Sequence, residues 1–273
     1  MNLSFFAAKP YPQRRDGHLM AGSSIIRAQQ VAEYLGAKLN PTSGYENDVC
    51  VYVKPGMNND GTPSQKFEKN SYIDAIDYTQ YTDWVRTCPE LKGIVASQYS
   101  YDVLKNQIPD RLVFIPQQHC NFERFTRNRK EITTVGIIGS PRSFQYPVDE
   151  IKKRMEQIGL KLMVNFDFQT RQDVVNFYKD VDIQIAWYVR NHFMKNPLKI
   201  INAASFGIPT VSNPRNNYKE VEGYYTSAES IDRLISEVEK LKNPENYETA
   251  SKNLLPMAEK YHISKIAELY KQL

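Results

Sequence analysis

The sequence has few cysteines and no long apolar run. Cys50, Cys88 and Cys120 are far apart and form no Cys-x-x-Cys pair, which argues against a disulfide framework and favours a reducing compartment. No stretch approaches the roughly 18 consecutive apolar residues that a membrane span needs. The apolar run after Met1 is too short for the core of a signal peptide. These absences predict a cytoplasmic protein with no transmembrane segment.

Several nucleotide-binding and catalytic signatures are also missing. The sequence contains no Gly-x-Gly-x-x-Gly and no Gly-x-x-x-x-Gly-Lys-Ser/Thr motif, which argues against dinucleotide oxidoreductases and P-loop NTPases. The Gly-Ser-Ser-Ile-Ile run at 22–26 is not a nucleophile elbow, which argues against a serine hydrolase. Histidines and cysteines show no zinc-site spacing. Asp180 and Asp182 form an Asp-x-Asp pair at a helix-to-strand junction, which we interpret as structural. We expect no metal ion and no cofactor.

The charge is mildly basic and evenly spread. Thirty-five Lys and Arg residues against 31 Asp and Glu residues give a net charge of +4. Because no cluster of basic residues forms an arm or stripe, we expect no nucleic-acid partner. An apolar fraction of 41% is enough to build buried cores and is not that of a disordered chain. A chain of 273 residues can form one large or two modest domains.

Short apolar runs alternate with amphipathic segments of helix length along the whole chain. The predicted strands are 2–8, 48–53, 71–76, 93–97, 111–116, 133–139, 160–166, 182–187 and 208–212. The main predicted helices are 24–35, 148–158, 171–180, 197–206, 227–241 and 246–272. The polar segment 117–131 interrupts the alternation and is predicted to be a linker. This pattern predicts an α/β fold with two doubly wound, Rossmann-like parallel sheets.

The stretch from Phe193 to Val221 carries the most information about function. Lys195 and Asn196 precede a predicted helix, and Lys199 lies in its first turn. A helix N-terminus presents free N–H groups and a partial positive charge, so lysines there gain a purpose when an anion is bound. Two interpretations stay open at this point, namely a phosphate site and two solvated lysines.

This stretch resembles the donor-site segment of group 1 retaining glycosyltransferases of the GT-B fold. The likeness lies in the small residues of the helix, the Gly207-Ile208-Pro209 turn, the apolar strand after it and the polar loop that ends in Glu220. The segments 113–125, 133–142 and 166–187 resemble other parts of that family in the same order. The resemblance covers about 111–241 and implies two Rossmann-like domains facing across a cleft, with a shortened N-terminal domain.

The resemblance also implies a division of labour. Residues 1–126 would form the acceptor-side domain, 127–258 the nucleotide-sugar donor domain, and 259–273 a C-terminal helix that crosses back to the first domain. The protein would be a metal-independent, hexosyltransferase-like enzyme of carbohydrate biosynthesis. It would transfer sugar from a UDP- or GDP-sugar to a glycan, a lipid-linked sugar or a small molecule.

The resemblance assigns donor-site roles to individual residues. Lys199, with Arg142 or Lys195, would neutralise the diphosphate as the nucleotide leaves, and Asn202 would hold the ribose. The implied donor-binding residues are Ser140, Arg142, Phe168, Lys195, Asn196, Lys199, Asn202, Asn216, Asn217 and Glu220.

The sequence departs from the family at two positions. The family carries two glutamates eight positions apart, where this chain has Met194 and Asn202. An amide can still bond ribose hydroxyls, but a thioether cannot replace a carboxylate. This leaves two alternatives to a transferase: a catalytically impaired protein that binds a nucleotide-sugar or a glycan, and a nucleotide-sugar epimerase of the same fold. Retention or inversion, the acceptor and the oligomeric state stay open.

The N-terminal half offers candidates for acceptor binding. Gly17 lies in a polar loop after the first strand, and Ser23, Ser24 and Arg27 follow at the start of a predicted helix. Either serine could equally be only a helix cap. His119 follows a strand end, where it could act as a catalytic acid or base or simply hydrogen-bond within the loop.

Overall fold

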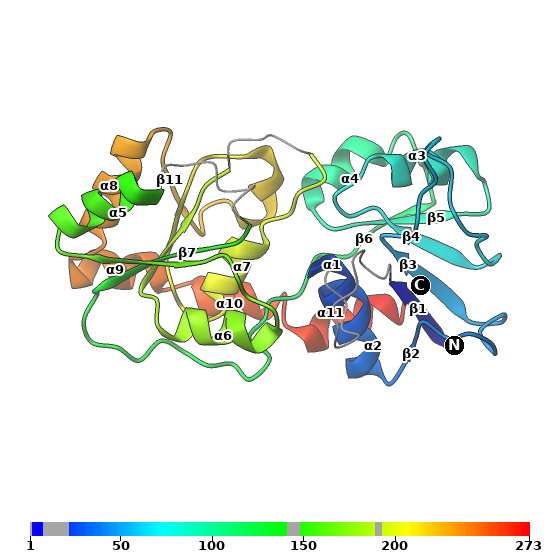
Figure 1. The fold of residues 1–273 in the computed structure, drawn as a ribbon, viewed down its shortest axis with the longest axis horizontal. Helices are drawn as coiled ribbons and strands as arrows, with labels where there is room; N and C mark the ends of the chain where they lie inside the picture. Colours follow the sequence, from blue (N-terminus) through cyan, green and yellow to red (C-terminus); the bar gives the residue numbers. More distant parts are fainter. Residues whose placement is uncertain (1, 8–21, 141–147, 189–192) are drawn as a thin grey trace. The chain divides into compact units, whose positions relative to one another are not determined.

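The computed structural model describes all residues except 1, 8–21, 141–147 and 189–192. The chain forms two α/β units, each with its own parallel sheet (Figure 1). The first unit comprises the described residues of Met1–Gln118, His192–Asn196 and Ile263–Leu273, and the second those of His119–Asn191 and Pro197–His262. The predicted class, with two Rossmann-like sheets, is confirmed. Within the described residues no helix is both long and apolar enough to cross a membrane.

The first unit is built on a six-stranded sheet in the order β2-β1-β3-β4-β5-β6. Its strands are β1 (Leu3–Ala7), β2 (Lys38–Leu39), β3 (Val49–Val53), β4 (Ser71–Asp74), β5 (Lys92–Val95) and β6 (Leu112–Phe114). All pair in parallel, and β3 is buried along its whole length. A strand that is apolar throughout and buried on both faces is what a parallel sheet covered by helices requires.

Helices and aromatic side chains cover this sheet. The first helical stretch consists of α1 (Gly22–Ser24), the π-helical turn η1 (Ile25–Gln29) and α2 (Gln30–Leu35), and the others are α3 (Gln80–Thr87), α4 (Gln98–Leu104) and α11 (Ile263–Tyr270). The stretch ends at Gly36, whose φ of 63° suits a left-handed C-terminal cap. The sequence predicts a regular helix at 24–35, and the structure is helical there, with a π turn over Ile25–Gln29 followed by the α-helix Gln30–Leu35.

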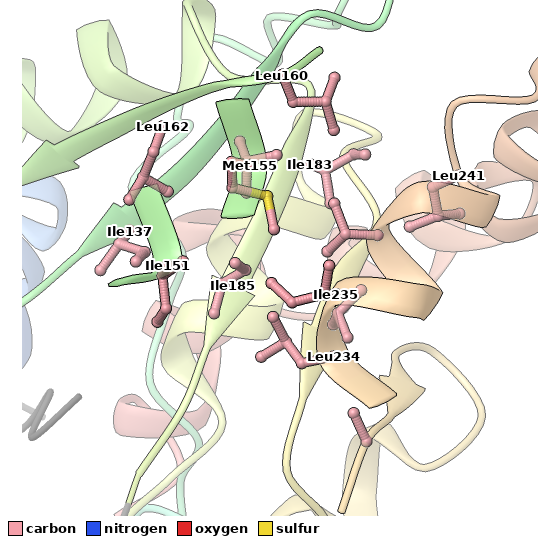
Figure 2. Packing of buried hydrophobic residues seen from close by; sticks show 14 of the residues in the cluster. Ile137, Ile151, Met155, Leu160, Leu162, Ile183, Ile185, Leu234, Ile235 and Leu241 are labelled. Atoms are coloured by element: carbon pink, nitrogen blue, oxygen red, sulfur yellow. The ribbon is translucent and has the colours of Figure 1, made fainter. Parts of the chain in front are cut away.

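The second unit has a five-stranded sheet in the order β11-β10-β9-β7-β8. Its strands are β7 (Thr134–Ile138), β8 (Lys161–Asn165), β9 (Ile183–Ala186), β10 (Thr210–Ser212) and β11 (Thr226–Ser227). Figure 2 shows one part of its core, where Ile137 and Ile185 of the sheet pack with Ile151, Met155 and Leu234 of the covering helices. These residues are the apolar positions that the strand and helix periodicities predict.

The helices of the second unit follow its strands in alternation. They are α5 (Val148–Gln157), α6 (Arg171–Lys179), α7 (Leu198–Ala204), the 3-10 helix η2 (Asn216–Val221), α8 (Ile231–Lys240), α9 (Pro244–Ser251) and α10 (Leu254–Glu259). The segment 246–272, predicted as helix, is divided among α9, α10 and α11. Pro256 explains the first division, because its ring would clash with the carbonyl of Lys252 if α9 continued, whereas the first turn of a new helix tolerates it.

The segment 117–131, predicted to be a linker, contains the border between the two units, which lies between Gln118 and His119. Five consecutive residues, 117–121, are buried. The Asn121 side chain donates to the carbonyls of Phe125 and Ser205, and accepts from the backbone N–H of Phe125. These hydrogen bonds allow the Asn121 side chain to be buried at little cost.

Candidate functional site

Two cations lie against one aromatic ring at the carboxyl edge of the second sheet. Lys199, in the first turn of α7, places its Nζ 4.6 Å from the centroid of the Tyr188 ring. Arg215 follows β10 and places its guanidinium carbon 5.1 Å from the same centroid. Its Nη1 also donates to the Tyr188 carbonyl oxygen at 3.3 Å. Ligands of parallel α/β sheets bind outside the carboxyl ends of the strands, so this cluster is a candidate anion site.

Gly139 brings the backbone of β7 up to the same cluster. It directly follows β7, has a φ of 150°, and a Cβ added to it would collide with Lys199 Nζ. Glycine alone combines this backbone conformation with so close an approach. The Lys199 ammonium therefore lies against the end of β7, beside Ser140.

Buried hydrogen bonds fix the backbone of Lys199. Its carbonyl oxygen accepts from Gln184 Nε2 at 2.9 Å and from the Tyr178 hydroxyl at 3.5 Å. Gln184 is fully buried in β9, and its Oε1 accepts from the same hydroxyl. Burial raises the pKa of Tyr178 well above its ordinary value, which keeps this hydroxyl protonated as the donor. The start of α7 is thus tied to the sheet.

Among the described residues, Lys199 contacts an aromatic ring and not a carboxylate. Its Nζ lies over the Tyr188 ring, and within the described parts of the chain it forms no ion pair with Asp or Glu. A ring face attracts a cation without cancelling its charge. This arrangement suits an anionic ligand.

The other predicted donor residues of the second unit have varied surroundings. Asn202 is 7% exposed, and its Oδ1 accepts the backbone N–H of Cys120 at 2.9 Å. Asn216 is exposed and Asn217 buried, and both lie in η2, which also contains Glu220. The remaining predicted donor residues are Ser140 and Phe168, which are exposed after β7 and β8, and Arg142, which lies outside the described residues.

Residues 193–196 belong to the first unit. Met194 is 2% exposed within the apolar core of that unit. Lys195 Nζ forms an ion pair with Asp77 Oδ1 at 2.5 Å, and Asn196 Nδ2 donates to Gln117 Oε1 at 2.6 Å. The described contacts of Lys195 and Asn196 are therefore with the first unit, whereas those of Lys199 are with the second.

His119 is buried beside a second histidine. It is 3% exposed, and its ring contacts that of His262 edge to face at 5.4 Å. Its Nδ1 accepts the backbone N–H of Asn121 at 3.2 Å, which places the ring proton on Nε2. Burial, helped by the positive potential of His262, lowers the pKa of His119 to about 3. The ring is therefore neutral at pH 7.

The acceptor-side candidates lie inside the first unit. Ser23, Ser24 and Arg27 are all buried. Arg27 Nε forms an ion pair with Asp74 Oδ2 at 2.5 Å, between η1 and β4. Gly17 lies outside the described residues. Apolar spacing identified the buried face of this helix but did not indicate that Arg27 lies within it.

Sequence reasoning identified Lys199 but missed its neighbours. Arg215 could have been found, because it comes three residues after β10, in the loop that already supplied Asn216 and Asn217. Tyr188 carried no signal, being one of 18 tyrosines. Among the described residues no group of three or more His, Cys, Asp or Glu side chains is arranged to hold a metal ion.

Comparison with known proteins gives structural matches only. No protein-family model and no curated protein matches the sequence. WaaG, a glycosyltransferase involved in lipopolysaccharide biosynthesis, is 12% identical with a TM-score of 0.64, and the match covers 98% of both chains. A glycosyltransferase from Rickettsia africae is 9% identical with a TM-score of 0.63, over 99% of this chain and 97% of the other.

Other matches include a nucleotide complex and longer proteins. HepE from Anabaena, crystallised in complex with UDP, is 11% identical with a TM-score of 0.60, over 100% of this chain and 99% of the other. The chain spans about half the length of TarM and of a chain in the GtfA/B complex, covering 54% and 52% of them. At identities of 9–12%, the structural similarity to these proteins shows the fold of this chain alone. The predicted resemblance to GT-B glycosyltransferases is confirmed at that level.

Proposed function

We propose that this protein is a glycosyltransferase that moves a sugar from a UDP- or GDP-sugar to an acceptor hydroxyl without a metal ion. The observation that carries the proposal is the pair of cations, Lys199 and Arg215, around Tyr188 at the carboxyl edge of the second sheet. The donor diphosphate would bind there, against Gly139. The likeness in fold to glycosyltransferases, one of them crystallised with UDP, supports the same reading.

The chemistry needs positive charge at this point. When the bond between the sugar and the diphosphate breaks, negative charge develops on the departing phosphate oxygen, and cations fixed in place stabilise it. A guanidinium can bind phosphate oxygens in a bidentate manner, whereas an ammonium acts as a compact point charge. The acceptor oxygen forms the new bond to the sugar, and its proton passes to the departing diphosphate or to water. Arg215 and Lys199 would thus act mainly in the transition state.

A binding protein without turnover is the second candidate. Met194 and Asn202 stand where the family that this chain resembles has glutamates. In the structure both side chains have other contacts. Met194 is in the core of the first unit, and Asn202 Oδ1 accepts from Cys120 N–H. Such a protein would bind the nucleotide-sugar through the same cations and release no product.

Nucleotide binding tests the donor site directly. We expect UDP or GDP, each assayed with and without Mg²⁺, to raise the melting temperature, since a ligand at a hundredfold excess over its Kd stabilises by about 2.7 kcal/mol. Lys199→Ala and Arg215→Ala should abolish the shift. Lys161→Ala is the matched control, because Lys161 is exposed at the amino end of β8. An unchanged shift in both site variants would refute the assignment.

Turnover separates the two candidates. The nucleotide-sugar of the base that binds is incubated with the protein, and the released nucleoside diphosphate and the sugar product are measured. Release with transfer to an acceptor supports the transferase. Binding with neither release nor a changed sugar identifies a binding protein, and an altered sugar still joined to the nucleotide identifies an epimerase.

A further inference from the structure

A second group of charged side chains lies at the carboxyl edge of the first unit's sheet. Lys54 directly follows β3, and Asp77 comes three residues after β4. Lys54 Nζ contacts Asp77 Oδ2 at 2.7 Å, and Lys195 Nζ contacts Asp77 Oδ1 at 2.5 Å. Each oxygen of the carboxylate is therefore bound by one ammonium group. The two lysines lower the pKa of Asp77 against the opposing effect of burial, so it stays ionised at neutral pH.

The backbone is strained where this group is built. Lys54 has a φ of 51° and Asp77 a φ of 69°, both in the left-handed region that non-glycine residues avoid. The two strands that precede them are hydrogen-bonded neighbours, with Val53 paired to Asp74. Strained residues of this kind are concentrated at binding and catalytic sites. Here the strained conformations bring the side chains of Lys54 and Asp77 together at the neighbouring carboxyl ends of β3 and β4.

An exposed aromatic ring stands beside the charged group. Tyr78 is 48% exposed, and Lys54 Nζ lies 5.7 Å from the centroid of its ring. Tyr81 supports the ring edge to face at 5.5 Å, and is itself anchored by its hydroxyl, which donates to the Pro55 carbonyl at 3.1 Å. Tyr78 is thus a supported ring that is open to solvent.

The third charged residue is held from both sides. Before Lys195, Met194 is inserted into the core of the unit and the Phe193 carbonyl accepts from Ser100 Oγ at 2.6 Å. After it, Asn196 donates to Gln117. The Lys195 side chain remains 43% exposed even though its Nζ is bound to Asp77. The Lys195 side chain is therefore partly open to solvent and held in position.

We propose that Tyr78, Asp77, Lys54 and Lys195 form a subsite for a pyranose ring, the acceptor sugar of the transfer reaction. An exposed aromatic face suits the C–H face of a sugar, and the carboxylate and the ammonium groups suit its hydroxyls as acceptor and donors. The position at the carboxyl ends of β3 and β4 is where a parallel sheet binds ligands. The assignment of this subsite to the acceptor rests on the proposed function. The subsite lies at the surface of the first unit, whereas Ser23, Ser24 and Arg27, the acceptor-side candidates from the sequence, are buried.

Saturation-transfer NMR with simple pyranosides tests the subsite. The probes are the methyl glycosides of glucose, galactose and N-acetylglucosamine at millimolar concentration. We expect at least one to receive saturation from the wild type and from Tyr78→Phe, which keeps the ring. Tyr78→Ala should lose the signal, and Asp77→Asn should weaken binding about tenfold, since a charged hydrogen-bond acceptor becomes neutral. Tyr78 is exposed, so an unchanged melting temperature shows that the two Tyr78 variants fold.

The outcomes separate this inference from the proposed function. Saturation by no pyranoside in the wild type, or equal saturation in Tyr78→Ala, overturns the subsite. If UDP or GDP still raises the melting temperature in that case, the donor site stands and only the subsite fails. If a pyranoside binds in a manner that depends on Tyr78 and no nucleotide binds, the sugar site stands and the transferase fails.

Discussion

Arg27 and Asp74 form an ion pair that is fully enclosed in the first unit. Burial opposes the charged form of Arg27, but the facing carboxylate outweighs it and raises the pKa of the guanidinium. Its Nη2 also donates to the Ile115 carbonyl at 3.0 Å, which joins η1 to the end of β6. Removal of one member would leave the other charge buried without compensation. This pair therefore serves the core of the unit.

His119 should make the protein less stable in mild acid. An unfolded histidine titrates near 6.5, whereas burial lowers the pKa of His119 to about 3 in the fold. Between these values the unfolded state binds the additional proton, so the free energy of unfolding falls as the pH is lowered. The expected loss between pH 7 and pH 5 is about 2 kcal/mol from this group.

Urea unfolding at several pH values, compared with His119→Gln, checks this contribution. Whatever its absolute stability, the variant should lose about 2 kcal/mol less than the wild type between pH 7 and pH 5. Parallel curves for the two proteins would show that His119 titrates normally. A neutral His119 would itself contribute no step near pH 6.5 to the pH profile of any transferase activity.

The sequence indicated the local position of Lys199, whose role in donor binding stays a prediction. Lys199 was identified from its place in the first turn of a helix, and the structure puts it at the carboxyl edge of a sheet. Its partner Arg215 is sixteen residues away, and only the pairing of β9 with β10 brings Arg215 close to Tyr188. The proximity of Arg215 to Tyr188 depends on the order of strands in the sheet, which the hydrophobic periodicity of the sequence does not indicate.

At the scale of elements, α11 completes the first unit from the far end of the chain. Tyr270 is fully buried, and its ring contacts Phe5 of β1 at 5.4 Å. Ile263 and Ile266 are buried on the same helix. The Tyr72 hydroxyl of β4 donates to the Leu273 carbonyl at 2.9 Å. The helix and the residues that follow it thus contact β1 and β4, which lie more than 180 residues earlier in the chain.

A pair of substitutions at Tyr270 measures what α11 contributes. Tyr270→Ala should destabilise the first unit by about 3–5 kcal/mol, as expected for truncation of a buried aromatic. Tyr270→Phe should change stability by less than about 1 kcal/mol, because the hydroxyl is buried and has no hydrogen-bond partner among the described residues. The difference between the two variants isolates ring packing from the hydroxyl.

The two tryptophans allow this measurement on one unit at a time. Trp84 lies in the first unit and Trp187 in the second. In a Trp187→Phe background, fluorescence reports unfolding around Trp84, and the Tyr270→Ala transition should move to lower urea. In a Trp84→Phe background the second unit is observed. A loss of stability seen equally in both backgrounds would contradict the assignment of α11 to the first unit.

Element prediction succeeded where one segment forms one local structure. The runs at 48–53 and 182–187 became β3 and β9, because buried parallel strands are apolar throughout. It failed for β2 and β11, which have two residues each and owe their conformation to pairing with a neighbouring strand. The π turn at Ile25–Gln29 had no sequence signal either, since its apolar spacing is that of an ordinary helix.

At the scale of the whole molecule, the two units differ in how many separate segments of the chain form them. The first draws on three separate segments, and two of them supply residues of its core or its sheet contacts, namely Met194 and Tyr270. The second draws on one long stretch, 119–262, from which only 192–196 departs. Composition and periodicity depend on the order of residues along the chain. They therefore did not indicate that the segment 192–196 belongs to the first unit although the residues on both sides of it belong to the second.

This difference predicts which part of the chain folds alone. The fragment 119–262 contains the whole core of the second unit, and we expect it to unfold cooperatively in urea with Trp187 as the probe. The fragment 1–118 has the complete six-stranded sheet but lacks the side chains of Met194 and Tyr270. Each missing side chain is worth several kcal/mol, a large part of the 5–15 kcal/mol that stabilises a typical domain. We therefore expect 1–118 to show no cooperative transition.

A synthetic peptide of residues 263–273 provides the control for the shorter fragment. If the missing helix is the cause, addition of the peptide in excess should restore part of the cooperative transition of 1–118, because a ligand that binds only the folded state stabilises it by mass action. The same peptide with Tyr270→Ala should restore less. A cooperative transition of 1–118 without any peptide would show that the fragment folds by itself. The segments 192–196 and 263–273 would then not be needed for the folding of the first unit.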